Sequence, residues 1–212
     1  MGLIGGFPGV IGGEILFDDG QNGACNLLDG LAVEVEKDAD GNIVAVKKDN
    51  VAGLKTVEER MRPIRGKSVS MVFQEPMTAL NPLMTVGQHL KEVLVKNGVS
   101  KSEATEQAEQ WLRKVHLDNP KERLEQYPWE LNGGACQRVM MALALCAEPA
   151  LLIADEPTTS LDATTQALII NLLEELTFDK EKLSVLLITH DLGVVSRLAN
   201  HIAVMYAGVT VE

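Results

Sequence analysis

The stretch LLIADEPTTSLD, residues 151–162, decides how the chain is interpreted. Its apolar start leads directly into two adjacent carboxylates, Asp155 and Glu156. A short, continuous apolar run predicts a strand buried on both faces, as in the centre of a parallel sheet. Pro157 stops the strand from continuing, and Asp162 is well suited to cap the helical pattern that follows.

Two carboxylates at the end of a buried strand indicate a binding or catalytic site. Ligands of α/β proteins gather at the carboxyl ends of parallel strands. One carboxylate can hold Mg²⁺ directly or through water, and the other can orient or deprotonate an attacking water. The alternative is that Asp155 and Glu156 are only exposed residues of a strand-to-helix turn. The pair alone does not decide between the two.

The composition is that of a globular protein. Of the 212 residues, 46% are hydrophobic and 23% are charged, which is enough for one sizeable core. The net charge of −11 argues against a nucleic-acid surface, although backbone N–H groups and Mg²⁺ can still bind an anionic ligand. Three cysteines without a CxxC pattern favour reduced thiols in the cytosol over a disulfide framework or zinc site. No stretch resembles a membrane span or a signal peptide, so we expect any work at a membrane to depend on a partner.

Strand and helix patterns alternate along the second half of the chain. This alternation predicts an α/β fold with a parallel sheet and right-handed crossovers. His190 follows a predicted strand and would lie at the same sheet edge as Asp155 and Glu156. The predicted strands are 14–17, 69–73, 151–154, 184–188, 202–206 and 209–211. The predicted helices are 86–97, 139–147, 163–176 and 192–199. A further helix is expected after residues 100–103, which form an S-x-x-E capping box.

Three parts are expected from these patterns. Residues 1–76 form the N-terminal part of the core, residues 77–147 a helical subdomain, and residues 148–212 the C-terminal part of the core. Residues from about 18 to 48 are interpreted as an inserted β-hairpin, because apolar and polar residues alternate on both sides of Asp40-Gly41.

Two glycine-containing segments bear on phosphate binding. Gly66-Lys67-Ser68 is not a phosphate loop, because GxxxxGK[ST] requires a glycine where Met61 stands and a helix, not a strand, afterwards. No other GK[ST] occurs in the 212 residues. In LNGGACQR, residues 131–138, two glycines precede an apolar helix, where backbone N–H groups can approach an anion. Ordinary loop glycines are the alternative.

Five segments in order resemble the nucleotide-binding subunit of ATP-binding-cassette (ABC) transporters. Gln74 matches the Q-loop, LNGGACQR the signature, LLIADEP the Walker B strand, Ser160 to Asp162 the D-loop, and His190 the switch histidine. The segments MVFQEPMTALNPLMTV and ITHDLGVVSRLANHIAVMYAG look more narrowly like dipeptide, oligopeptide or nickel importers. The resemblance covers nearly the whole chain. It implies a P-loop NTPase-like (ABC ATPase) parallel-sheet core with a helical signature subdomain.

The resemblance also implies a mechanism in which two subunits sandwich two ATP molecules. Asp155 and Gln74 would hold Mg²⁺, Glu156 would position the attacking water, and His190 would contact the γ-phosphate; Gln74 would also link this site to the helical subdomain. The remaining ATP-binding residues implied by the match are Asn132, Gly133, Gly134 and Gln137, with Asp162 at the dimer seam.

The implied partners are integral-membrane permease subunits and a second ATP-binding subunit, in a homo- or heterodimer. Nucleic acid is not among them. The implied location is peripheral, on the cytoplasmic face of the plasma membrane. Two alternatives remain: a soluble ABC ATPase of DNA repair or translation, and a non-catalytic ABC-like interaction module.

The sequence departs from the family pattern at the signature and at the phosphate loop, among other places. Asn132 stands where the signature has serine, followed by Ala135 and Cys136. The Walker A phosphate loop, placed in the family just before the position of Met1, does not occur in this sequence. We therefore expect a truncated subunit with weak or no ATPase activity in isolation. The coding sequence upstream of Met1 would test this expectation.

Overall fold

The computed structural model describes residues 14–18, 23–29, 34–39, 43–47, 51–159, 161–178 and 183–212. The chain divides into two compact units, Met1–Ser68 and Val69–Glu212. The three-part division expected from the sequence, with boundaries at residues 76 and 147, stays a prediction.

The first unit contains two short antiparallel strand pairs and a helix. Strand β1 (Leu16–Phe17) pairs with β2 (Cys25–Asn26), and β3 (Glu34–Lys37) pairs with β4 (Ile43–Lys47). Strands β3 and β4 pair on either side of Asp40-Gly41, which lies outside the described residues, and the interpretation of residues 18–48 as an inserted hairpin stays a prediction. Helix α1 (Val51–Met61) follows and was not predicted from the sequence.

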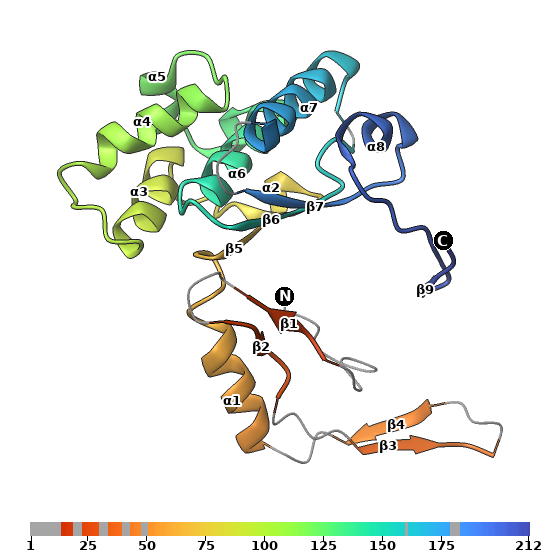
Figure 1. Ribbon diagram of the computed structural model, residues 1–212. Helices are drawn as coiled ribbons and strands as arrows, with labels where there is room; N and C mark the ends of the chain where they lie inside the picture. The colour runs from red at the N-terminus through yellow and green to blue at the C-terminus, as the bar shows by residue number, and fades with distance from the viewer. Residues whose placement is uncertain are drawn as a thin grey trace. The chain divides into compact units, whose positions relative to one another are not determined.

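The second unit contains a parallel sheet in the order β5-β6-β7 (Figure 1). Its strands are β5 (Val69–Val72), β6 (Leu151–Asp155) and β7 (Ser184–Ile188). Both pairings are parallel: Val69 lies opposite Leu151 in one, and Leu151 lies opposite Ser184 in the other. The predicted α/β class and parallel core are confirmed by this pairing.

The prediction that the central strands are buried on both faces is wrong for this structure. Leu152 and Ala154 in β6 are fully buried, but their neighbours in the strand are only partly buried. In β7, Leu186 and Ile188 are 52% and 46% exposed. The physical reason is that the core is one-sided: Val72 and Leu152 of the sheet pack with helices α6 (Gly133–Leu145) and α7 (Ala163–Phe178), which lie on the same side of it (Figure 1).

The middle of the chain is helical, as predicted. Helices α3 (Val86–Lys96), α4 (Ala104–Lys114) and α5 (Pro120–Glu125) pack against one another, and α6 packs against the first two. Two shorter helical segments, α2 (Pro76–Ala79) and η1 (Pro128–Glu130), precede α3 and α6. The apolar stripes of these helices form one core that includes Leu90, Leu94, Leu112 and Met141.

The predicted capping box of α4 is present in part. The Ser100 hydroxyl donates to Glu103 Oε2 at 2.6 Å, and Glu103 N–H donates to Ser100 Oγ at 3.3 Å. The regular helix nevertheless begins at Ala104, so the capped segment is a turn that precedes it.

The end of the chain differs from the prediction. Residues 202–206 and 209–211 were expected to add two strands to the parallel core. The structure instead forms an exposed antiparallel hairpin of β8 (Met205–Tyr206) and β9 (Val209–Thr210). The reason is the turn: Ala207 and Gly208 both have positive φ, at 47° and 80°, and two such residues favour a tight two-residue hairpin.

Helix α8 (Leu192–Leu198) precedes that hairpin and follows β7. Among the described helices, none has both the length and the apolar character that crossing a bilayer would require.

Candidate functional site

The candidate site lies where the three parallel strands end. Gln74 follows β5, Glu156 follows β6 directly, and His190 follows β7. The parallel register brings Asp155 opposite Ile188, so the two segments that carry Glu156 and His190 leave the sheet side by side. This is the edge at which α/β proteins bind their ligands.

The backbone of Glu156 turns the chain sharply at this edge. Its φ is 45°, in the left-handed region that non-glycine residues adopt uncommonly. Its N–H donates to the carbonyl of Ile188 at 2.9 Å, which extends the β6–β7 ladder by one hydrogen bond. Unusual backbone conformations of this kind cluster at functional sites.

Three donors converge on the Glu156 carboxylate. Gln74 Nε2 donates to Oε2 at 2.7 Å, and the Thr159 hydroxyl donates to the same oxygen at 2.9 Å. His190 Nδ1 lies 3.2 Å from the other oxygen, Oε1. The Glu156 side chain is 24% exposed and that of His190 76% exposed, so both are accessible to a ligand. All three residues predicted to be catalytic therefore meet at one carboxylate.

These contacts determine the charge of the site. The hydrogen bond from Thr159, and after it that from His190, lowers the pKa of the Glu156 carboxyl. Glu156 is thus ionised at neutral pH. An ionised, partly exposed carboxylate can accept a hydrogen bond from water and orient it, whereas it cannot act as a general acid.

Asp155 is the last residue of β6 and is partly buried. Within the described chain, no group of three His, Cys, Asp or Glu residues is arranged to hold a metal ion. Mg²⁺ commonly keeps several waters and binds through one or two carboxylates together with substrate phosphates. A single partly buried carboxylate such as Asp155 fits that kind of shared site and not a closed protein cage, and a part for Gln74 in holding the ion stays a prediction.

A second group of predicted residues lies at the start of α6. Asn132 caps this helix: its Oδ1 accepts the Ala135 N–H at 2.8 Å, and its carbonyl accepts the Cys136 N–H at 3.0 Å. Asn132 and Gly133 are exposed. These contacts leave the N–H groups of Gly133 and Gly134 available to an external acceptor.

Gly134 also has a packing role inside the chain. A Cβ at this position would lie 2.4 Å from Thr165 Cγ2, closer than Cβ contacts come, so the Thr165 side chain would have to shift. The Thr165 hydroxyl donates to Asp162 Oδ2 at 2.7 Å, and Asp162 Oδ1 accepts the N–H groups of Thr164 and Thr165. These hydrogen bonds lower the pKa of the Asp162 carboxyl, and the one from the Thr165 hydroxyl contributes most. Asp162 is thus the N-cap of α7, as predicted, and the starts of α6 and α7 touch.

Gln137 belongs to the interior in this structure. Its side chain is 2% exposed, and its Nε2 has no hydrogen-bond partner. It therefore does not face solvent, whereas Gly133 does, and the predicted contact of Gln137 with ATP has no support in this structure.

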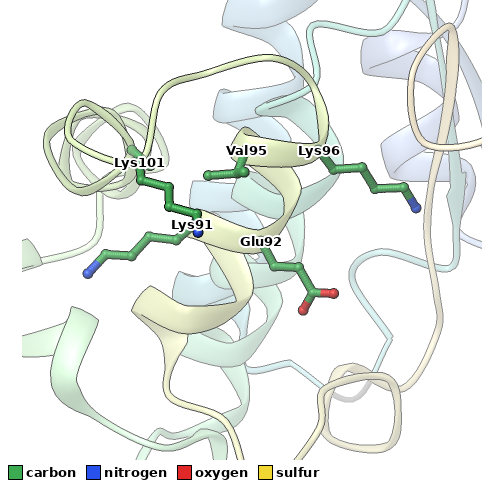
Figure 2. A pocket seen from close by; sticks show the side chains of 6 residues that line it. Lys91, Glu92, Val95, Lys96 and Lys101 are labelled. Atoms are coloured by element: carbon green, nitrogen blue, oxygen red, sulfur yellow. The ribbon is translucent and has the colours of Figure 1, made fainter.

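An open depression elsewhere on the surface is not part of this site (Figure 2). It measures about 570 Å³. The side chains of Lys91 and Lys96 extend in opposite directions from it, so their charges do not converge on one ligand. Its lining residues are Lys91, Glu92, Val95, Lys96, Lys101 and Ala104.

Comparison with known proteins identifies the family. Residues 13–159 match the ABC transporter family. The chain is 48% identical, over 177 residues, to the dipeptide transport ATP-binding protein DppD of Bacillus subtilis, covering 83% of this chain and 52% of that protein. The chain belongs to the ABC transporter family.

Two further relatives have the same character. DppD of Escherichia coli is 44% identical over 203 residues, covering 94% of this chain and 62% of the relative. The oligopeptide transport ATP-binding protein OppD of Bacillus subtilis is 50% identical over 156 residues, covering 73% of this chain and 43% of the relative. The chain spans about half of the length of these ABC proteins.

Solved structures support the fold alone. The dimeric ATP-binding cassette MJ0796, in a post-hydrolysis state with ADP and Pi, superposes with a TM-score of 0.60 at 23% identity, covering 87% of this chain and 88% of that one. CbiO1 of Clostridium perfringens, part of the ABC transporter complex cbiONQ, also superposes with a TM-score of 0.60, covering 81% of this chain and 66% of that one. The α/β ABC-cassette fold is therefore shown.

The sequence did not point to two residues of the site. Thr159 lies three residues after Glu156, within hydrogen-bond reach across the turn, but no pattern in the sequence marks it. Thr165 has no sequence signal either, because its contact with Gly134 joins segments distant in sequence. The ligand-binding roles of the predicted site residues stay predictions.

Proposed function

We propose that the chain is the ATP-binding and ATP-hydrolysing part of an ABC importer subunit that drives peptide uptake. The observation that carries this proposal is the Glu156 carboxylate at the end of β6, with Gln74 and His190 hydrogen-bonded to it. The names of the relatives, which are dipeptide and oligopeptide transport ATP-binding proteins, support the peptide class.

Glu156 positions the attacking water in this proposal. Its carboxylate is ionised and partly exposed, so water can reach it. His190, with its exposed ring, contacts the γ-phosphate and holds the leaving and attacking groups in line. Asp155 and Gln74 would hold Mg²⁺, which would neutralise charge on the phosphate oxygens.

The start of α6 acts on the nucleotide of a second subunit. Gly133 and Gly134 present backbone N–H groups at an exposed helix N-terminus, where an anion is favoured. Asn132 contributes its side-chain amide. Asp162 lies beside this helix start through Thr165 and would lie at the dimer seam.

The proposed partners are integral-membrane permease subunits and a second ATP-binding subunit, with the protein peripheral on the cytoplasmic face of the plasma membrane. The acidic net charge of −11 disfavours the alternative of a DNA- or RNA-associated ABC ATPase. The assembled Glu156 cluster disfavours the non-catalytic alternative, since an interaction module has no need of it.

The test uses the complete gene product that carries these residues, purified with its membrane partners and reconstituted in vesicles. Dipeptides and short oligopeptides, presented with a binding subunit, are expected to stimulate Mg²⁺-dependent ATP hydrolysis. Stimulation by DNA or RNA instead would support the soluble ABC ATPase. No ATP turnover with any of these additions would leave only the non-catalytic module.

A further inference from the structure

We infer that Thr159 is a positioning residue for ATP hydrolysis: its hydroxyl holds the Glu156 carboxylate in the orientation that the attacking water requires. The inference rests on the proposed function and adds to it a residue that the resemblance did not supply. It is carried by the hydrogen bond from Thr159 Oγ1 to Glu156 Oε2, 2.9 Å long.

The geometry of the 156–159 turn makes this bond local and stiff. Thr159 N–H donates to the Glu156 carbonyl at 3.2 Å, so backbone and side chain of Thr159 both bind the same residue. Pro157 fixes one backbone angle inside the turn. Thr158 between them is buried, which anchors the turn to the body of the protein.

The other two donors to Glu156 come from elsewhere. Gln74 is carried by the segment after β5 and His190 by the segment after β7. In the proposed function both also contact the bound nucleotide or its Mg²⁺, so neither can serve Glu156 alone. Thr159 moves with Glu156 and is the donor that can stay in place when ATP draws the others away.

Threonine suits this role better than other hydroxyl residues. Its β-branched side chain restricts rotation about χ1, so the hydroxyl is held toward one acceptor. Serine keeps the donor but rotates more freely. Valine keeps the branched shape and removes the donor, which makes Thr159→Val a close isostere.

The experiment measures ATP hydrolysis by the complete gene product in its transport complex. Thr159→Val is expected to lower kcat about 10- to 100-fold, the cost of losing a hydrogen bond to a charged group, while KM for ATP changes less than about 3-fold. Thr159→Ser should restore kcat to within about 3-fold of wild type. Thr177→Val is the matched control, because the Thr177 hydroxyl donates only to backbone carbonyls within α7.

A double mutant separates positioning from stability. If Thr159 acts through Glu156, Thr159→Val should add no further loss in a Glu156→Gln background. A kcat near wild type for Thr159→Val, or an additive loss in the double mutant, would overturn the inference and leave the proposed function intact. A wild-type complex without ATP turnover would overturn the proposed function and this inference together.

Discussion

Asn132 has a structural role that is independent of any ligand. Its Oδ1 caps α6 by accepting the Ala135 N–H at 2.8 Å. Asn132→Ala should therefore lower the free energy of unfolding by about 1 kcal/mol. Asn132→Ser should change the free energy of unfolding much less, since serine is an equally good cap. Urea unfolding of the three proteins checks this; equal stability of all three would show that the cap contributes nothing.

The same variants test the signature role of Asn132 in a second subunit's site. In a Glu156→Gln form of the complete gene product, Asn132→Ser should leave monomer ATP affinity unchanged and give equal or stronger ATP-dependent dimerisation. Asn132→Ala should weaken it. Light scattering reports the dimer. If serine, asparagine and alanine dimerise alike, the start of α6 is a capped glycine turn and not a working signature.

Asp191 gives a pH-dependent contribution to stability. Hydrogen bonds from the N–H of Gly193, then that of Val194, and from Gln166 lower the pKa of this N-cap carboxyl in the folded state. A lowered folded pKa means that the contribution is present above the unfolded pKa of about 3.9 and is lost as pH falls through the folded pKa. Asp191→Asn keeps a cap acceptor without the charge. The free energy of unfolding of this variant should therefore fall less between pH 5 and pH 3 than that of the wild-type protein. Parallel curves for the two proteins would contradict this.

At the scale of elements, the contact between the starts of α6 and α7 depends on the absence of a side chain at Gly134. Gly134→Ala would place a methyl 2.4 Å from Thr165 Cγ2. We expect a loss of about 1–3 kcal/mol in unfolding free energy, typical of overpacking.

Two variants isolate the cause of that loss. Gly133→Ala is the matched control, because a Cβ there meets nothing within 4 Å, and it should be neutral or slightly stabilising. Thr165→Ser removes the clashing methyl and keeps the hydroxyl on Asp162, so it should rescue Gly134→Ala in part. If alanine has equal effects on the unfolding free energy at positions 133 and 134, and Thr165→Ser does not rescue Gly134→Ala, then helix propensity and not packing causes the change.

Elements with a strong local pattern could be predicted from the sequence, and those set by long-range packing could not. The helices α3, α7 and α8 follow apolar periodicity and clear caps, and their predicted extents agree with the structure to within a few residues. The apolar run at 202–206 misled, because apolar content alone does not distinguish a buried strand from an exposed hairpin. The positive φ of Ala207, which makes that hairpin, has no sequence signal of its own.

Some residues of the site could likewise be predicted from the sequence and others could not. Asp155 and Glu156 could be found from the strand that ends in them, and His190 from its place after the next strand. That Gln74 and Thr159 share one oxygen of Glu156 depends on side-chain geometry, which no spacing rule contains.

At the scale of the whole molecule, the 212 residues contain no GxxxxGK[ST] sequence to cradle the phosphates. We therefore expect the 212-residue chain to hydrolyse ATP weakly or not at all, compared with an ABC ATPase that carries this loop. A malachite-green assay of both proteins at matched concentration checks this. Comparable turnover, abolished by Glu156→Gln, would show that the site works without such a loop.

The central claim is that Glu156 positions the water for ATP hydrolysis. The direct measurement is ATP turnover by the complete gene product in its transport complex, with Glu156→Gln compared with the exposed control Glu122→Gln on α5. We predict that Glu156→Gln lowers kcat by about 10²-fold or more while ATP affinity stays within about 3-fold, and that Glu122→Gln is unchanged. A Glu156→Gln complex that hydrolyses ATP at close to the wild-type rate would contradict the claim.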